Sequence, residues 1–383
     1  MSESKIQQVF SRGFAQYLDA FSPSEVQYKT ANSIMNCKTG RCGHNISICD
    51  DCGHTDFHSN SCRNRNCPNC QAVLKEVWID SRRAEVIDAP YFHVVFTVPA
   101  ELNPLIYSNQ ELLYSLLHRC SAETLLELSN DRKYLGATPG IIQVLHTWGQ
   151  KLNFHPHIHC IVSGGGLTKD LKLNLCGGKF YLPVKVMASK FRGKFLSGIQ
   201  DLYAFDRLAF SSSCEKLRGH HAWNEFRDSL YRKEWCPYIK ETFNGSGNAI
   251  EYLGRYTHRI AITNSRIRSV NQTHVTFSAK DYKTGEKCDV TLENKEFIRR
   301  LLMHVLPSGF QKIRYYGFLG NRGKKKNLRI IFRIQGRQKF RSILAGLPMD
   351  ELLKQVWGYD IHICPVCGCY GMRHAGRTFP LRN

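Results

Sequence analysis

A cysteine-rich stretch between Cys37 and Cys70 constrains the fold more than any other feature of this sequence. Seven of the 16 cysteines lie in it, among Asn, Gly and Ser residues with little apolar periodicity. Such a stretch cannot bury a core of its own, so bound metal is expected to hold it together. The first seventeen residues do not resemble an export signal, which favours reduced thiols over disulfides.

The spacing of four of these cysteines predicts one zinc site. Cys49 and Cys52 form one CxxC turn, and Cys67 and Cys70 form another. Each turn offers two thiolates, and two turns complete a tetrahedron around one zinc ion. Such a module draws folding free energy on the order of 10 kcal/mol from its metal.

The remaining ligand-type residues of the stretch predict a second zinc ion. Its expected ligands are Cys37, His44 and Cys62, and the fourth is left open between Cys42 and His54. The alternative is that these cysteines are buried and metal-free, but the stretch lacks the apolar surroundings which that would require.

A third CxxC turn lies near the end of the sequence, at Cys364 and Cys367. One turn supplies half of a zinc site. Either Cys369, His362 or His374 completes it, or it reaches another part of the chain, or it binds no metal.

The balance of charge indicates a polyanionic partner. The chain has 53 Lys and Arg against 32 Asp and Glu, a net charge of +21. The densest basic stretch, 312–341, holds eleven Lys or Arg and no acidic residue, and phosphate contacts explain such a stretch. Any single lysine in it has the alternative of a solvated surface charge. The residues expected to contact DNA here are Arg314, Lys324, Lys325 and Lys326.

A His-Ile-His segment gives the first indication of a catalytic site. On a strand, His157 and His159 point to the same side and Ile158 to the other, so two imidazoles can hold one metal ion. Taken alone, the pair has the alternative of histidines satisfied by hydrogen bonds.

Two tyrosines give the second indication. Tyr252 and Tyr256 stand four residues apart, on one face of a predicted short helix. Arg255 and Arg259 in the same segment can clamp a phosphate. The alternative is a pair of helix aromatics packed against a sheet. A metal ion with a nearby phenol is typical of phosphoryl transfer.

The order of predicted elements favours an α+β fold. Buried strands near 91–98, 141–148 and 156–162 alternate with helices near 6–21 and 101–128, and sequential strands this close are expected to pair antiparallel. The remaining expected elements are helices at 72–87, 185–210, 221–235 and 249–256, and strands at 259–263, 269–277 and 287–292. The predicted domains are 1–36 (helical), 37–88 (zinc-binding), 89–305 (catalytic) and 306–383 (basic, with the last CxxC turn).

Several motifs together resemble a known family. His157-Ile158-His159 resembles the HUH (His-hydrophobic-His) motif of rolling-circle nucleases, and the tyrosine segment resembles that of the two-tyrosine transposases of the insertion sequence ninety-one family. The segment from Ser61 to Gln71 is similar to that family's zinc signature, and the segment from Gly309 to Gly317 to a late part of its transposase domain. Asn66 stands where the family is expected to carry His.

The resemblance implies the fold, the reaction and the cofactors. The expected fold is an antiparallel-sheet HUH nuclease palm with helices on one face, preceded by a small zinc-ribbon-like module. His157 and His159 would hold Mg²⁺ or Mn²⁺, and Tyr252 and Tyr256 would cleave single-stranded DNA at transposon ends and targets through a 5′-phosphotyrosine. A third polar ligand is expected but not assigned among four candidates: His93, Gln143, His146 and His155.

Two alternatives remain open at this stage. The same chemistry serves plasmid replication initiators and relaxases, and a chain of this kind can also be a DNA-binding regulator whose nuclease centre has decayed. With no membrane-spanning run in the sequence, a bacterial cytoplasmic, nucleoid-associated location is expected.

Overall fold

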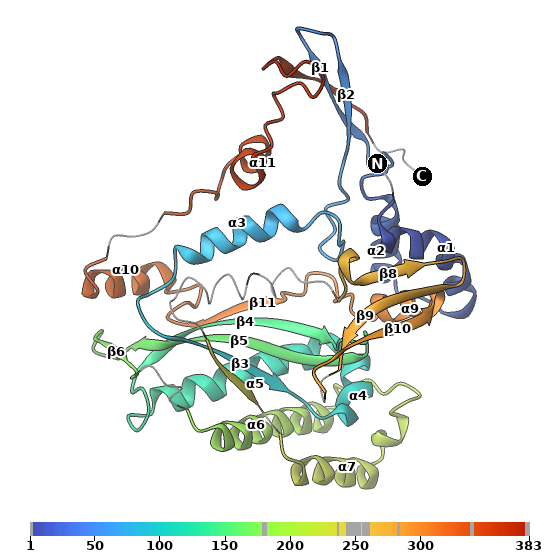
Figure 1. Cartoon of the computed structure of the whole chain (residues 1–383). Helices are drawn as coiled ribbons and strands as arrows, with labels where there is room; N and C mark the ends of the chain where they lie inside the picture. The colour runs from blue at the N-terminus through green and yellow to red at the C-terminus, as the bar shows by residue number, and fades with distance from the viewer. Residues whose placement is uncertain are drawn as a thin grey trace.

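The computed structural model of the chain describes residues 3–177, 182–235, 237–242, 254, 261–281, 284–337 and 341–379. Within these ranges, three antiparallel sheets are connected and covered by helices (Figure 1). None of the described helices combines the length and the apolar character that crossing a bilayer requires.

The largest sheet forms the centre of the molecule. Its strands follow the order β11-β4-β5-β3-β7, and β6 pairs with one end of β5. Strands β3, β4 and β5 are buried along almost their whole length because both faces of the sheet are covered. The strand bounds are β3 Tyr91–Thr97, β4 Thr138–Trp148, β5 Phe154–Leu167, β6 Leu173–Leu175, β7 Tyr238–Thr242 and β11 Ile313–Gly317.

One face of this sheet packs on a layer of helices that includes α5, α6 and α7 (Figure 1). The main core lies there, with Ile158 of β5 against helices that bring Leu117 and Phe195. Helices α5 and α6 approach closely at Gly198, where a Cβ would stand 2.4 Å from Leu116 Cδ1. The helix bounds are α4 Asn103–Ser108, α5 Gln110–Asn130, α6 Val184–Ala204 and α7 His220–Arg232.

The opposite face is covered by α3 (Ala72–Arg83) and α10 (Lys324–Ile334) (Figure 1). Ile79 of α3 and Ile331 of α10 join the same buried cluster as Val144 of β4. The expectation of helices on one face is therefore wrong. Apolar residues of β4 and β5 point to both sides, so each face of the sheet needs a cover.

A smaller sheet, β10-β9-β8, packs against the N-terminal helices. Helix α1 starts with a capping box between Ser4 and Gln7 and buries an apolar stripe, as its periodicity predicts. At Gly13 a Cβ would stand 2.6 Å from Asn294 Cβ, so α1 lies directly on α9. The bounds are α1 Lys5–Ala20, α2 Glu25–Asn36, β8 Ile267–Val270, β9 His274–Lys280, β10 Lys287–Glu293 and α9 Asn294–Leu302.

The third sheet joins distant parts of the sequence. Hairpin β1–β2 (His44–Cys49 and Thr55–Ser59) projects at the top of Figure 1, and β12 (Met372–Arg377) pairs with β1. Helix α11 (Met349–Trp357) precedes β12 along the chain. The division into four domains stays a prediction, although this sheet contains strands from both the second and the last of them.

Most predicted elements between 5 and 232 are confirmed, whereas the later ones need correction. The single strand expected at 269–277 is two strands, β8 and β9, separated by a turn. Residues 261–263, expected to end a strand, have no strand structure. The expected tyrosine helix at 249–256 lies outside the described residues except for Gly254, which is helical.

The buried His118 makes the free energy of unfolding depend on pH. Its Nδ1 lies 2.9 Å from the side-chain amide of Gln143, and burial lowers the pKa of His118 to about 3 from 6.5. Between these values only the unfolded chain takes up the proton, so stability is lost as the pH falls from 6.5 towards 3.

We predict that His118→Asn, which keeps a hydrogen-bonding group beside Gln143 but does not titrate, reduces this loss. The difference in unfolding free energy between the two proteins should change by up to about 1.4 kcal/mol per pH unit in that range. Urea unfolding at a series of pH values measures it. Parallel pH profiles of the two proteins would contradict the assignment.

Candidate functional site

Three histidines meet on the central sheet, on the face covered by α3 and α10. His157 and His159 lie on β5, and His146 lies on β4 directly opposite His157. Their ring nitrogens lie within 4.8 Å of one another. The Nε2 atoms of His157 and His159 are 3.1 Å apart. Two nitrogens bound at right angles to one ion, each about 2.1 Å from it, would be about 3 Å apart.

Hydrogen bonds orient two of these rings. His157 Nδ1 donates to the backbone oxygen of His155 at 2.7 Å, which leaves its Nε2 unprotonated when the ring is neutral. His159 Nδ1 lies 2.8 Å from Nε2 of His93 on β3. A donor at His159 Nδ1 likewise turns the lone pair of Nε2 towards His157. Facing lone pairs repel, and a cation between them removes that repulsion.

Burial keeps the cluster in the form that binds metal. Loss of solvation, together with the charge of His155, lowers the pKa of His157 to about 3. His146 and His159 are buried, while His157 stays partly exposed. His146 also stacks on Trp148 at 4.4 Å between ring centroids. Neutral imidazoles with one accessible edge are suited to a divalent cation that shares its coordination with a substrate.

The cluster fits Mn²⁺ better than Mg²⁺. Among the described residues no carboxylate joins the three imidazoles. Imidazole nitrogens suit transition-metal ions, whereas Mg²⁺ prefers oxygen ligands. Of the four candidates for a third ligand, His146 is the one that the structure brings to the pair. His146 reaches the pair because the register of β4 on β5 places it opposite His157. The register shifts at a bulge between His146 and Trp148, so this pairing could not be predicted from the sequence.

The tyrosine segment is described at one position. Tyr252, Tyr256, Arg255 and Arg259 lie outside the described residues. Gly254, between the two tyrosines, is buried and helical, and a Cβ there would stand 2.3 Å from Ile79 Cγ1. Helix α3 therefore packs directly on the backbone of Gly254.

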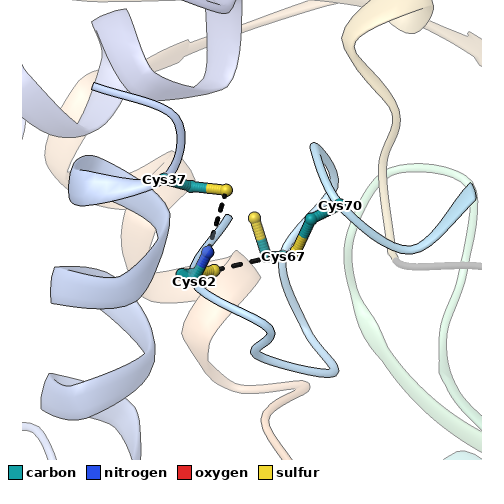
Figure 2. Close-up of side chains that lie close together, drawn as sticks. All are labelled: Cys37, Cys62, Cys67 and Cys70. Atoms are coloured by element: carbon teal, nitrogen blue, oxygen red, sulfur yellow. Dashed lines mark hydrogen bonds between the residues drawn. The ribbon is translucent and has the colours of Figure 1, made fainter. Parts of the chain in front are cut away.

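Four cysteines converge between the N-terminal helices and α3 (Figure 2). Cys37 ends α2, Cys62 follows β2, and Cys67 and Cys70 lead into α3. The sulfurs lie within 4.8 Å of one another, with Cys62 and Cys70 at 3.8 Å. Thiolates about 2.3 Å from a tetrahedral zinc are about 3.8 Å apart, so the cluster fits zinc.

A second four-cysteine cluster lies at the tip of the β1–β2 hairpin. It consists of Cys49, Cys52, Cys364 and Cys367. Cys49 Sγ lies 3.7 Å from Cys367 Sγ, and Cys52 Sγ lies 3.7 Å from Cys364 Sγ.

These clusters correct the predicted ligand pairing. Cys67 and Cys70 meet Cys37 and Cys62, and not Cys49 and Cys52. The reason is the hairpin: strands of five or six residues carry its tip about 17–20 Å from its base. Neighbouring CxxC turns are thus held apart.

The other candidate zinc ligands lie outside both clusters. His44 Nδ1 is 3.3 Å from Thr378 Oγ1, and Cys42 Sγ is 3.4 Å from the backbone oxygen of Asn36. Of the alternatives for the last CxxC turn, the structure has it reach another part of the chain. The residues not included are His44, Cys42, His54, Cys369, His362 and His374.

The predicted DNA-contacting residues of the basic stretch divide into two groups. Lys325 and Lys326 are exposed on α10. Lys324 instead pairs with the half-buried Glu85 at 2.7 Å, and Arg314 donates to Ser115 Oγ at 3.0 Å. The first pair is available to a ligand, and the second pair stabilises the fold.

A cavity of about 430 Å³ is lined in part by Trp148, whose ring stacks on His146 of the histidine cluster. Its lining includes Lys312 and His304. Loss of solvation, with the nearby charge of Arg65, lowers the pKa of Lys312 to about 7, and burial lowers the pKa of His304 to about 4. Sequence reasoning missed both residues, although Lys312 lies in the segment from Gly309 to Gly317 that carries the family resemblance.

Comparison with known proteins identifies the class. Residues 9–98 match a family described as "Transposase zinc-binding domain", and residues 140–327 match one described as "Putative transposase". The "Putative transposase y4qJ" of Sinorhizobium fredii is 39% identical over 92% of this chain and 91% of its own length. The "Transposase for insertion sequence element IS801" of Pseudomonas savastanoi pv. phaseolicola is 27% identical over 81% of this chain and 74% of its own. No solved structure matches.

Fold, site and relatives together define a DNA-cleaving transposase with an N-terminal zinc-binding domain. The chain belongs to the IS91 family of insertion-sequence transposases, as its motifs indicate. DNA is therefore its substrate, and the two cysteine clusters support bound zinc.

We predict that the histidine cluster binds Mn²⁺ and that His146→Ala weakens binding on the order of 100-fold, because one of three ligands is lost. His155→Ala is the matched control, since it keeps the backbone oxygen that orients His157. Calorimetric titration of zinc-loaded protein with Mn²⁺ measures both. Equal affinities for the two variants would exclude His146 as a ligand.

Proposed function

We propose that this transposase is a metal-dependent endonuclease of the HUH type that acts on single-stranded DNA in rolling-circle transposition. The observation that carries the proposal is the meeting of His146, His157 and His159 on adjacent strands. The match to transposases over most of the chain favours this function over replication initiation or a decayed regulator.

The three imidazoles would hold Mn²⁺ or Mg²⁺, and His93 would orient His159. When bound, the cation supplies Lewis acidity to a phosphate oxygen. Because His157 resists protonation and stays partly exposed, the site keeps an open edge for the scissile phosphate.

Tyr252 and Tyr256 would act as nucleophiles. The phenol oxygen attacks phosphorus and loses its proton to water, while the bond from phosphorus to the 3′ oxygen breaks and that oxygen takes up a proton. The product is a 5′-phosphotyrosine and a free 3′ hydroxyl. Attack of a 3′ hydroxyl on this ester reverses the step, so two tyrosines allow strand transfer without ATP.

Cationic side chains would bind the phosphates of the strand. Arg255 and Arg259 stand in the tyrosine segment and would clamp the scissile phosphate. Exposed basic residues on α10 and just before it would contact the DNA backbone on either side of the scissile phosphate. These residues are Arg322, Lys325, Lys326, Arg329 and Arg333.

A zinc ion at Cys37, Cys62, Cys67 and Cys70 would have a positioning role. Cys70 stands two residues before α3, and α3 carries Ile79 onto Gly254. The metal would thereby fix the start of the helix whose Ile79 packs on Gly254, between the two tyrosines.

The tyrosine assignment predicts a covalent product. Incubated with Mn²⁺ and a labelled single-stranded end oligonucleotide, the protein should form a protein–DNA adduct that resists denaturation. Tyr252→Phe combined with Tyr256→Phe should abolish the adduct and keep DNA binding. The exposed Tyr238 provides the control, since Tyr238→Phe should leave the yield unchanged. An adduct formed by the double variant would refute the assignment.

The contact at Gly254 predicts a suppressible defect. Gly254→Ala would place a Cβ 2.3 Å from Ile79 Cγ1, so residue 254 and Ile79 must move apart, and adduct formation should slow on the order of 10- to 100-fold. Ile79→Ala in the same chain should restore most of the rate by removing the opposing side chain. Gly193→Ala, where a Cβ meets nothing within 4 Å, is the control. Failure of Ile79→Ala to restore the rate would argue against this contact.

A further inference from the structure

We propose that Cys49, Cys52, Cys364 and Cys367 bind one structural zinc ion, which closes a zinc ribbon built from segments more than 300 residues apart. The zinc-binding family match ends at residue 98 and therefore contains only half of this ligand set. The proposal is independent of the catalytic function proposed above.

The two CxxC turns have the same local conformation. In each, the residue after the second cysteine is a glycine with positive φ, 69° at Gly53 and 74° at Gly368. In each, the N–H of that glycine donates to the oxygen of the first cysteine at 3.0 Å. This turn directs two thiols to one side, and the two turns face each other.

The sulfur atoms stand at the spacing that a shared ion requires. Each turn contributes one sulfur to each of the two 3.7 Å contacts, Cys49 with Cys367 and Cys52 with Cys364. A tetrahedral zinc–thiolate site has sulfurs about 3.8 Å apart, whereas a disulfide requires about 2.05 Å.

The module has too small a core to hold itself together. Its buried apolar cluster consists of Cys49, Cys364 and Met372. Outside that cluster, the segments are held by the pairing of β12 with β1 and by polar contacts such as Arg373 Nε to Asp50 Oδ1 at 2.5 Å. An exposed ion pair of this kind contributes little to stability. A structural metal supplies the missing stabilisation in such small modules.

The metal content of the purified full-length chain tests the proposal. The wild type should hold two zinc ions per chain by plasma mass spectrometry. Cys364→Ser with Cys367→Ser should hold one, and so should Cys49→Ser with Cys52→Ser. The matched control is Cys369→Ser, which changes an exposed cysteine outside the cluster and should keep two.

The four-serine variant distinguishes one shared ion from two separate ones. If the two turns share an ion, the variant lacking all four thiols still holds one zinc, at Cys37 and its partners. If each turn binds its own ion, loss of both turns removes more zinc than loss of either one. Unchanged zinc content in the Cys364→Ser, Cys367→Ser protein, with circular dichroism showing a folded chain, would overturn the proposal.

Alkylation of thiols provides a second readout that does not require any variant to fold. Cys52 and Cys367 are exposed, so burial does not shield them from iodoacetamide, whereas a bound metal would. Both should resist alkylation until a chelator is added, while Cys369 reacts at once. Immediate alkylation of all three in the zinc-loaded protein would also overturn the proposal.

Discussion

The pairing register of β4 on β5 is the constraint on which the candidate active site depends. A strand alternates its faces with a period of two, so a slip of one residue would send His146 to the opposite face from His157 and His159. The hairpin between the strands fixes this register, with Gly149 N–H donating to the oxygen of Asn153 at 2.9 Å. Apolar residues on both faces strengthen it, because any slip would expose a buried side chain.

With zinc bound as proposed, metal ions take the place of an apolar core in the two cysteine-rich parts of the chain. One cysteine cluster fastens the end of α2 to the start of α3, and the other fastens the β1–β2 hairpin to the segment that carries β12. The first lies next to the helix that packs on Gly254, and the second lies at the projecting tip (Figure 1). The two clusters therefore lie in different parts of the molecule, one next to the helix that packs on Gly254 and one at the projecting tip.

Local patterns predicted what short-range physics controls. The periodicity of α1, the continuous apolar run of β3 and the His-Ile-His alternation each reflect one element, and the structure confirms all three. Three other features depend on contacts between elements. These are the pairing of the cysteines into two clusters, the position of His146 beside His157 and His159, and the packing of α3 and α10 on the second face of the sheet. Sequence spacing does not predict these contacts. An extended hairpin separates residues that are close in sequence, and a sheet brings together residues that are far apart in sequence.

The central claim, that three imidazoles share one catalytic cation, is tested most directly by X-ray absorption at the manganese edge of the Mn²⁺-loaded protein. The account predicts the multiple-scattering signature of three imidazoles, with Mn–N distances about 2.1–2.2 Å and oxygen ligands in the remaining positions, by analogy with other divalent ions on histidine. A spectrum of oxygen ligands alone, or one unchanged by His157→Ala, would contradict it.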